Sequence, residues 1–148
     1  MKKGLWLIVA FGVLIVCFQA CKKSSPHVKT KTELLVQSSW KLSTAVAAGL
    51  GDITSQVPAC YKDNVYTFVS NGTGTINEST NVCSPTTAGP FTWSFLNNET
   101  TLHLSATIFT GGSSDFTLTS LTETNLVISQ VVTIAPLPAT NVTFTFIH

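Results

Sequence analysis

The cysteines of this chain could take part in several kinds of chemistry. Cys17 and Cys21 fall in or directly after an apolar stretch near the amino terminus, and Cys60 and Cys83 fall in the rest of the chain. Exported proteins commonly join such a pair as a disulfide, which contributes roughly 3 kcal/mol for a loop of this length. A metal or redox pair is the alternative, although the spacings typical of zinc sites are absent from the sequence. The sequence therefore favours a disulfide between Cys60 and Cys83.

Histidines, serines and carboxylates form no catalytic motif in the sequence. Of the three histidines, only His103 falls in a segment of alternating hydrophobicity, where it points away from the core. Most carboxylates stand near turn residues, where solvation is their usual role and acid–base chemistry is rare. The sequence has no G-x-S-x-G, P-loop or G-x-G-x-x-G motif. We therefore expect no enzyme, no catalytic residue, no metal site and no cofactor.

Alternation of apolar and polar residues is the main pattern from Trp40 onward. Segments such as Phe91–Phe95 place apolar side chains on one strand face and hydroxyls on the other. Turn residues such as Asn71-Gly72 separate these segments. We predict a helical turn near Thr32–Val36 and then eight strands: Trp40–Ala47, Asn64–Ser70, Gly74–Glu78, Phe91–Phe95, Thr101–Thr107, Asp115–Ser120, Leu126–Val132 and Val142–Ile147. Such strands are typical of a sandwich or a barrel. Consecutive hairpins favour an all-β, up-and-down antiparallel barrel, because closure removes exposed edges.

Aromatic side chains are the remaining candidates for a site, and they would bind a ligand without covalent chemistry. An eight-stranded barrel is just wide enough to be filled by side chains or to hold one small ligand, and the sequence leaves both alternatives open. The residues predicted to line a ligand site are Tyr66, Phe68, Trp93, Phe95, Phe116, Phe144 and Phe146. We expect a partial cavity between the Trp93/Phe95 and Phe144/Phe146 faces, reached under the segment Ala45–Ala59.

The amino terminus has the order of a secretory signal peptide. Two lysines precede an apolar run from Leu5 to Phe18. An uncleaved membrane helix is the alternative, since the stretch is at the lower limit of a spanning length. The end of the run, Phe18-Gln19-Ala20-Cys21, resembles the lipobox of bacterial lipoproteins, whose cysteine is acylated and becomes the first mature residue. The resemblance implies a signal peptide at residues 1–20, a flexible tether at 21–33 that starts at acylated Cys21, and a folded domain at 34–148.

Several short motifs in the folded domain resemble a lipocalin-like domain family of exported Bacteroidetes lipoproteins. Leu34–Leu42 is similar to the opening "LL-x-G-x-W-x-L" of that family, and Cys60–Phe68 is similar to its "C-x-K-D-D-x-Y-T-F" segment. Asn71-Gly72-Thr73, Cys83 and Phe91–Phe95 follow in the order of the family. The resemblance covers about residues 34–148 and implies a small lipocalin-like barrel.

Composition narrows the classes of function. The 148-residue chain has no arginine, and after Glu33 only two lysines face six carboxylates. The domain therefore has no basic face for nucleic acid. We expect a lipoprotein of the cell envelope, in the outer membrane, whose acyl chains enter the bilayer and whose barrel mouth binds a small apolar ligand. The alternative is a non-enzymatic structural or interaction lipoprotein with a filled barrel core. The sequence identifies no protein partner.

Acylation can be tested at Cys21. The variant Cys21→Ser removes the thiol that would carry the lipid, so the folded domain should appear in the soluble fraction after cell fractionation. Wild-type protein labelled with a radioactive fatty acid serves as the positive control. A variant that stays in the membrane uncleaved would support the membrane-helix alternative.

Overall fold

The segments of alternating hydrophobicity form strands in the computed structural model, which describes residues 27–109, 111–133, 135–136 and 138–148. The predicted signal peptide and Cys21 lie outside the described residues. Eight strands carry the fold: β1 (Trp40–Ala47), β3 (Asn64–Phe68), β4 (Thr73–Glu78), β5 (Gly89–Leu96), β6 (Thr101–Leu104), β7 (Asp115–Leu121), β8 (Asn125–Val132) and β9 (Thr140–Ile147). The shorter elements are α2 (Lys31–Val36), β2 (Gly51–Asp52), the 3-10 helix η2 (Thr54–Gln56) and α3 (Ala59–Lys62).

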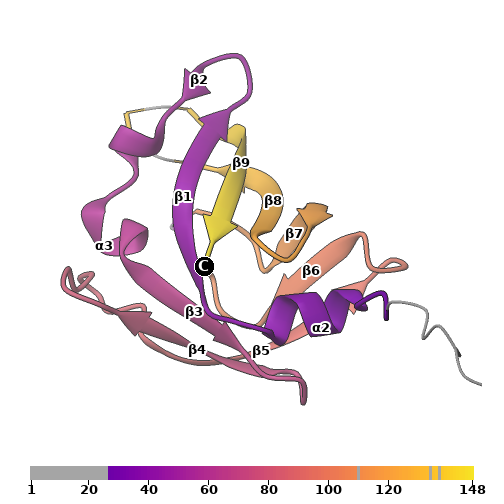
Figure 1. The fold of residues 1–148 in the computed structure, drawn as a ribbon. Helices are drawn as coiled ribbons and strands as arrows, with labels where there is room; N and C mark the ends of the chain where they lie inside the picture. Colours follow the sequence, from indigo (N-terminus) through magenta and orange to yellow (C-terminus); the bar gives the residue numbers. More distant parts are fainter. Residues whose placement is uncertain (1–26, 110, 134, 137) are drawn as a thin grey trace, which may run out of the picture.

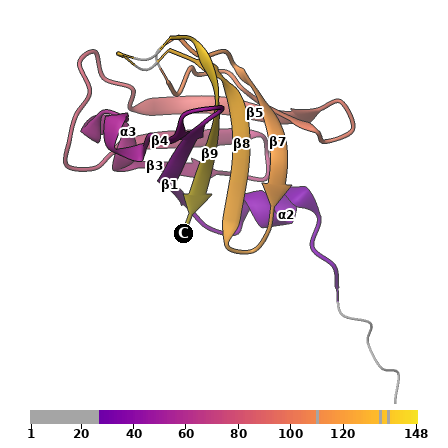
Figure 2. The same ribbon diagram turned by 90° about the horizontal axis from the view of Figure 1, so that it is seen from above.

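Pairing between the first and last long strands closes the sheet. Each strand from β3 to β8 pairs with the next along the chain in antiparallel fashion, and β1 pairs with β3 at one edge and with β9 at the other. In Figure 2, β7, β8 and β9 run across β3, β4 and β5, as expected when the strands of a closed barrel are strongly tilted. The structure confirms the predicted closed, eight-stranded antiparallel barrel.

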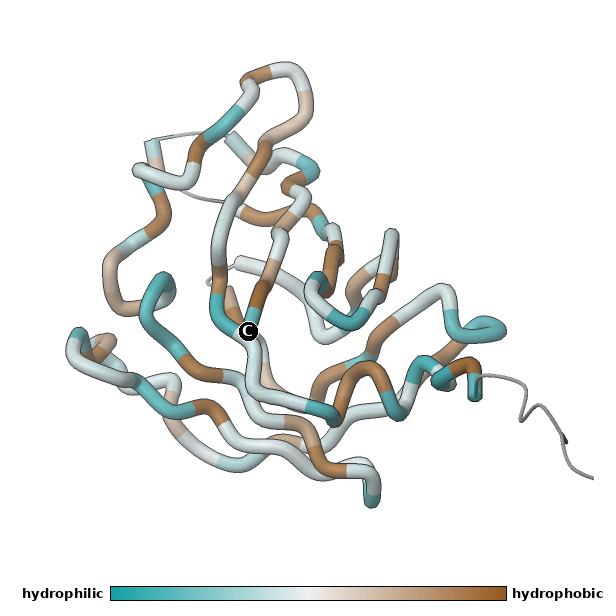
Figure 3. Tube along the Cα trace, in the orientation of Figure 1, coloured by the Kyte–Doolittle hydropathy of each residue, from teal (hydrophilic) through white to brown (hydrophobic). Residues whose placement is uncertain are grey.

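The barrel core consists of the residues that the alternation predicts to point inward. Along β9, Val142, Phe144 and Phe146 are buried, whereas the threonines between them are only partly covered. Burial alternates in the same way along β4 and β8, and Figure 3 shows hydrophobic positions recurring between hydrophilic or neutral ones along the trace. Threonine suits this surface because it is β-branched and its hydroxyl can contact water.

The two ends of the barrel differ in the length of their connections. At one end, which we call the helix end, α2 lies beside the short turns 69–72, 97–100 and 122–124 (Figure 1). At the opposite end, which we call the loop end, the strands are joined by the longer connections 48–63, 79–88, 105–114 and 133–139. Longer connections place more side chains at the loop end, where these side chains can form a pocket.

Helix α2 closes the helix end of the barrel. It begins at a capping box, in which the Glu33 backbone N–H donates to Thr30 Oγ1 and the Thr30 backbone N–H donates to the Glu33 carboxylate. Leu35 is fully buried, and its carbonyl accepts a 2.8 Å hydrogen bond from Trp40 Nε1. The His148 ring lies 4.1 Å from the Trp40 ring, centroid to centroid. Trp40 therefore ties α2, the start of β1 and the end of β9 together.

Two local features differ from the sequence predictions. The segment after β1, for which no strand is predicted, forms the short strand β2, because Gly49 and Gly51 adopt φ angles of 76° and 81° that let the chain turn back on β1. Strand β6 ends at Leu104, three residues before its predicted end, although Ala106 packs against the core as its phase predicts. None of the helices in the described ranges is long and apolar enough to cross a bilayer.

The role of Trp40 can be measured by substitution. Trp40→Phe leaves the buried Leu35 carbonyl without its donor, so the free energy of unfolding should fall by about 1–3 kcal/mol. Denaturant unfolding followed by circular dichroism gives this value. The exposed neighbour Lys41→Ala is the matched control and should change stability by less than about 0.5 kcal/mol. Equal stability of the Trp40 variant and the wild type would show that α2 docks without the indole.

Candidate ligand pocket

The seven aromatic residues predicted to line a ligand cavity all contribute to the barrel core. Six of them are buried, and Phe95 is half-buried against the others. Edge-to-face contacts connect several of the rings, with Phe68 and Trp93 5.8 Å apart and Tyr66 and Phe146 5.5 Å apart, centroid to centroid. These residues fill the space that a ligand would otherwise occupy.

The interior of the barrel has almost no free volume. A space of about 10 Å³ lies among core side chains that include Tyr66, Phe68 and Phe146. One water molecule needs about 10–15 Å³ by this measure. The Trp93 indole N–H donates to the carbonyls of Val69 and Thr73, at 3.1 and 3.0 Å, so it needs no ligand or water as a partner. This space in the core therefore holds no organic ligand.

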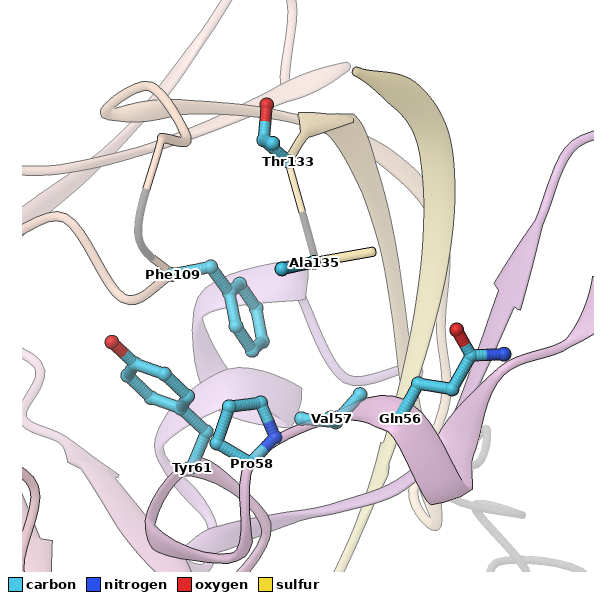
Figure 4. Close-up of a pocket in the computed structure, with 7 residues that line it drawn as sticks. All are labelled: Gln56, Val57, Pro58, Tyr61, Phe109, Thr133 and Ala135. Atoms are coloured by element: carbon cyan, nitrogen blue, oxygen red, sulfur yellow. The ribbon is translucent and has the colours of Figure 1, made fainter. Parts of the chain in front are cut away.

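A larger pocket lies at the loop end (Figure 4). Its volume is about 240 Å³, and we call it the loop-end pocket. The described residues that line it are Gln56, Val57, Pro58, Tyr61, Phe109, Thr133 and Ala135. They come from three connections of the loop end, 48–63, 105–114 and 133–139. None of the seven predicted aromatic residues lines this pocket.

The connection 48–63, which forms one wall of the pocket, is held in place by hydrogen bonds to β1. The Ile53 backbone N–H donates to the Ala45 carbonyl, and the Ala45 backbone N–H donates to Thr54 Oγ1, both at 2.8 Å. Ile53 and Val57 are buried and hold the segment against the core. The segment Ala45–Ala59, under which we expect the entrance to a cavity from the sequence, therefore supplies part of the lining of the pocket.

Phe109 forms the floor of the pocket. It comes from the connection between β6 and β7, and with its neighbour Ile108 it is buried in the loop end of the barrel. Its ring stacks on Phe144 at 4.1 Å with an interplanar angle of 10°, and the Tyr61 ring lies 5.8 Å away at 57°. The turn after it is closed by a 3.0 Å hydrogen bond from the Gly112 N–H to the Phe109 carbonyl. Phe109 thus separates the loop-end pocket from the core.

A disulfide fixes the helix that carries Tyr61. Cys60 in α3 is bonded to Cys83 in the connection between β4 and β5, with 5.1 Å between their Cα atoms. This confirms the predicted pairing. Because Cys60 stands directly before Tyr61, the disulfide restrains one wall of the pocket.

Two carboxylates hold the connection between β4 and β5 next to this disulfide. Glu78, which is only 8% exposed, accepts hydrogen bonds from the Thr86 hydroxyl, the Thr87 backbone N–H and the Thr87 hydroxyl at 2.7, 2.6 and 2.7 Å. These donors, the Thr86 hydroxyl above all, lower the pKa of Glu78 to about 2 despite its desolvation. Asp63 accepts from the backbone N–H groups of Asn81 and Thr80 at 2.8 and 3.0 Å, which lowers the pKa of Asp63.

The electrostatic character of the pocket is neutral. No charged side chain is among the seven lining residues, and their polar atoms belong to Gln56, Thr133 and Tyr61. Elsewhere in the described residues, His103 Nδ1 contacts Asp115 Oδ1 at 2.5 Å on the outer, solvent-exposed face of β6 and β7. Among the described residues, no three His, Cys, Asp or Glu side chains come together in a way that suits a metal ion. The loop-end pocket is therefore a neutral and mainly apolar cavity.

The sequence contained weaker signals for the residues that the prediction missed. Ile108 and Phe109 are an apolar pair in a connection, and connections normally run over the surface and are polar. Tyr61 stands outside the alternating strands, directly after a cysteine. Neither position has the period of two on which the prediction of the aromatic site depended.

The fold defines a class of protein. A closed, up-and-down antiparallel barrel of eight strands is the architecture that lipocalins have. A family model described as a lipocalin-like domain matches residues 37–128, more than half of the chain, and the chain belongs to this family. A comparison with curated proteins gave no match.

The connection between β4 and β5, which Glu78 holds in place, should be sensitive to acid. Glu78 protonates near its ordinary pKa of 4.5 in the unfolded chain but only near 2 in the folded protein. Its contribution to stability is therefore complete above pH 4.5 and is lost as the pH falls toward 2. Glu78→Gln should lower the denaturation midpoint at pH 6, and the gap from the wild type should shrink as the pH falls from 4.5 to 2.5.

The control for this experiment is Glu99→Gln, because the Glu99 side chain is about half exposed and lies 3.9 Å from Lys31 Nζ. Glu99→Gln should change the denaturation midpoint little, both at pH 6 and at pH 2.5. A gap between Glu78→Gln and the wild type that stays constant across this pH range would contradict the assignment.

Proposed function

We propose that this protein is a membrane-anchored lipocalin-like lipoprotein that binds a small apolar ligand at the loop end of its barrel. The observation that carries the proposal is the loop-end pocket, about 240 Å³ in volume and lined mainly by apolar side chains. Ligand sites are usually concave, mostly apolar and furnished with a few polar groups. The loop-end pocket has this composition, with Gln56 and Thr133 as polar groups beside Val57, Pro58 and Phe109.

The position of the pocket supports binding at the mouth of the barrel. The core beneath the floor is filled, whereas the mouth is open between three connections. A ligand that binds there displaces water from the Phe109 and Tyr61 rings, and burial of apolar surface contributes about 25 cal/mol per Å². The binding requires no change in the strands.

The anchoring part of the proposal depends on the amino-terminal sequence. A signal peptide that ends at Ala20-Cys21 would deliver the domain to the cell envelope, in the outer membrane, with acyl chains of Cys21 in the bilayer. The described chain begins at His27, and α2 starts at Lys31. A tether of this kind would leave the barrel free to meet ligands near the membrane surface, and the proposed activity is binding rather than catalysis.

A second candidate function is supported by the filled core. The aromatic side chains that were expected to line a cavity pack against each other, as they do in a barrel that serves as a rigid scaffold. In that case the protein is a non-enzymatic structural or interaction lipoprotein, and its threonine-rich outer face contacts another component of the envelope. A measurement of ligand binding distinguishes the two candidate functions.

Binding can be measured with the fluorescent two-ring probe 1-naphthylamine, which is neutral at pH 7. The full chain in lipid nanodiscs should bind the probe saturably at micromolar concentration, about −8 kcal/mol. Ala135→Trp places a large ring in the pocket and should weaken binding at least tenfold. Ala139→Trp, in the same connection but outside the pocket, is the matched control and should bind as the wild type does.

Fluorescence that rises linearly in all three samples would reflect partition into the lipid alone. That outcome would leave the structural candidate as the better account of this barrel.

A further inference from the structure

The depth of the loop-end pocket is set by the floor at Phe109. Phe109 is only 3% exposed, and its ring is held from below by the stacked Phe144 ring. The neighbouring Ile108 lines the space of about 10 Å³ inside the core, so the pair stands between the two volumes. A ligand in the pocket therefore meets a wall of aromatic carbon before it reaches the core.

The volume of the pocket limits the size of its ligand. A cavity of about 150 Å³ holds one benzene ring, and sites for drug-sized molecules measure roughly 300–1,000 Å³. At about 240 Å³, the loop-end pocket lies between these limits. One or two fused rings fit this volume, whereas a lipid-length chain has to extend beyond it.

The lining of the pocket selects against charge. A carboxylate or ammonium group that leaves water needs an ionic partner or several hydrogen bonds. None of the seven lining side chains carries a charge. A charged ligand would lose hydration on entering and gain no ion pair.

The shape of the pocket favours a flat ligand. The Tyr61 and Phe109 rings are inclined at 57° to each other and form adjoining aromatic surfaces. Pro58 and Val57 continue the apolar surface, and Figure 4 shows the Gln56 amide and the Thr133 hydroxyl at the edge of the pocket, pointing away from Phe109. Aromatic rings pack favourably in tilted or offset arrangements, so a flat ring can contact the Tyr61 and Phe109 surfaces together.

We infer that the loop-end pocket takes a compact, uncharged ring compound of one or two fused rings, and that the Phe109 floor excludes lipid-length chains. This inference rests on the proposed function and gives its ligand a chemical class. It separates this barrel from one that encloses a long apolar molecule in its interior.

The charge part of the inference is tested with two ligands of the same shape. The full chain in lipid nanodiscs is titrated with 2-naphthamide and with 2-naphthoate at pH 7, and the methyl NMR signals of Val57 and Ala135 report occupancy of the pocket. We expect saturable shifts with 2-naphthamide and at least tenfold weaker binding of 2-naphthoate. Equal affinity of the two compounds would overturn the inference.

The size part is tested with linear alcohols from butanol to decanol, with affinities referred to the free aqueous concentration. Each additional buried methylene strengthens binding about fourfold, so the affinity should rise with chain length and then level off in the wild type. Phe109→Ala removes the floor and should let the rise continue to longer chains. Phe109→Leu, which keeps a branched apolar side chain there, should level off like the wild type and serves as the variant with the smaller risk of misfolding.

The outcomes separate the inference from the proposed function. An affinity that rises through decanol in the wild type would overturn the inference while it supports apolar binding. The absence of saturable shifts with 2-naphthamide and with every alcohol would overturn both.

Discussion

Strand β1 has to form hydrogen bonds along both of its edges, and the rest of the structure depends on this requirement. It pairs with β9 from Lys41 to Ala47 and with β3 at Trp40 and Lys41 only. A register shift between Leu42 and Thr44 lets the strand bend from one neighbour to the other. With both edges occupied, the sheet closes and the inward side chains of the eight strands face one another. Closure also gathers the connections into two ends, one sealed by α2 and one left to form a pocket.

The barrel could be predicted from the sequence because strands and turns have local signatures. The alternation in Val142–Ile147 fixes which side chains face inward, and Asn71-Gly72 marks a hairpin whose glycine has a φ of 83°. The disulfide could be predicted because only Cys60 and Cys83 lie in the domain. The pairing of β1 with β9 has no such local signature, since the two strands are distant in the sequence and only the need to cover edges brings them together.

The pocket could not be predicted in the same way. Its residues lie in connections, where side-chain direction follows from the turns and from long-range contacts rather than from a period. Phe109 lies over the core because it stacks on Phe144, and Tyr61 is oriented by a helix that is tied to Cys83. The interior aromatic residues were assigned to a ligand because a pattern shows which residues face inward but not how completely they fill the space. Packing to crystal-like density is the usual state of a protein interior.

The pocket draws its walls from three stretches of chain, and the match to the family model covers two of them. The family model covers residues 37–128, which include the wall at 56–61 and the floor at Phe109, while Thr133 and Ala135 follow the matched part. Thr133 and Ala135 lie between β8 and β9, outside the paired strands, so a substitution at either position would change the lining of the pocket while the register of the barrel stays the same. The shape of the pocket can therefore change without a change in the barrel.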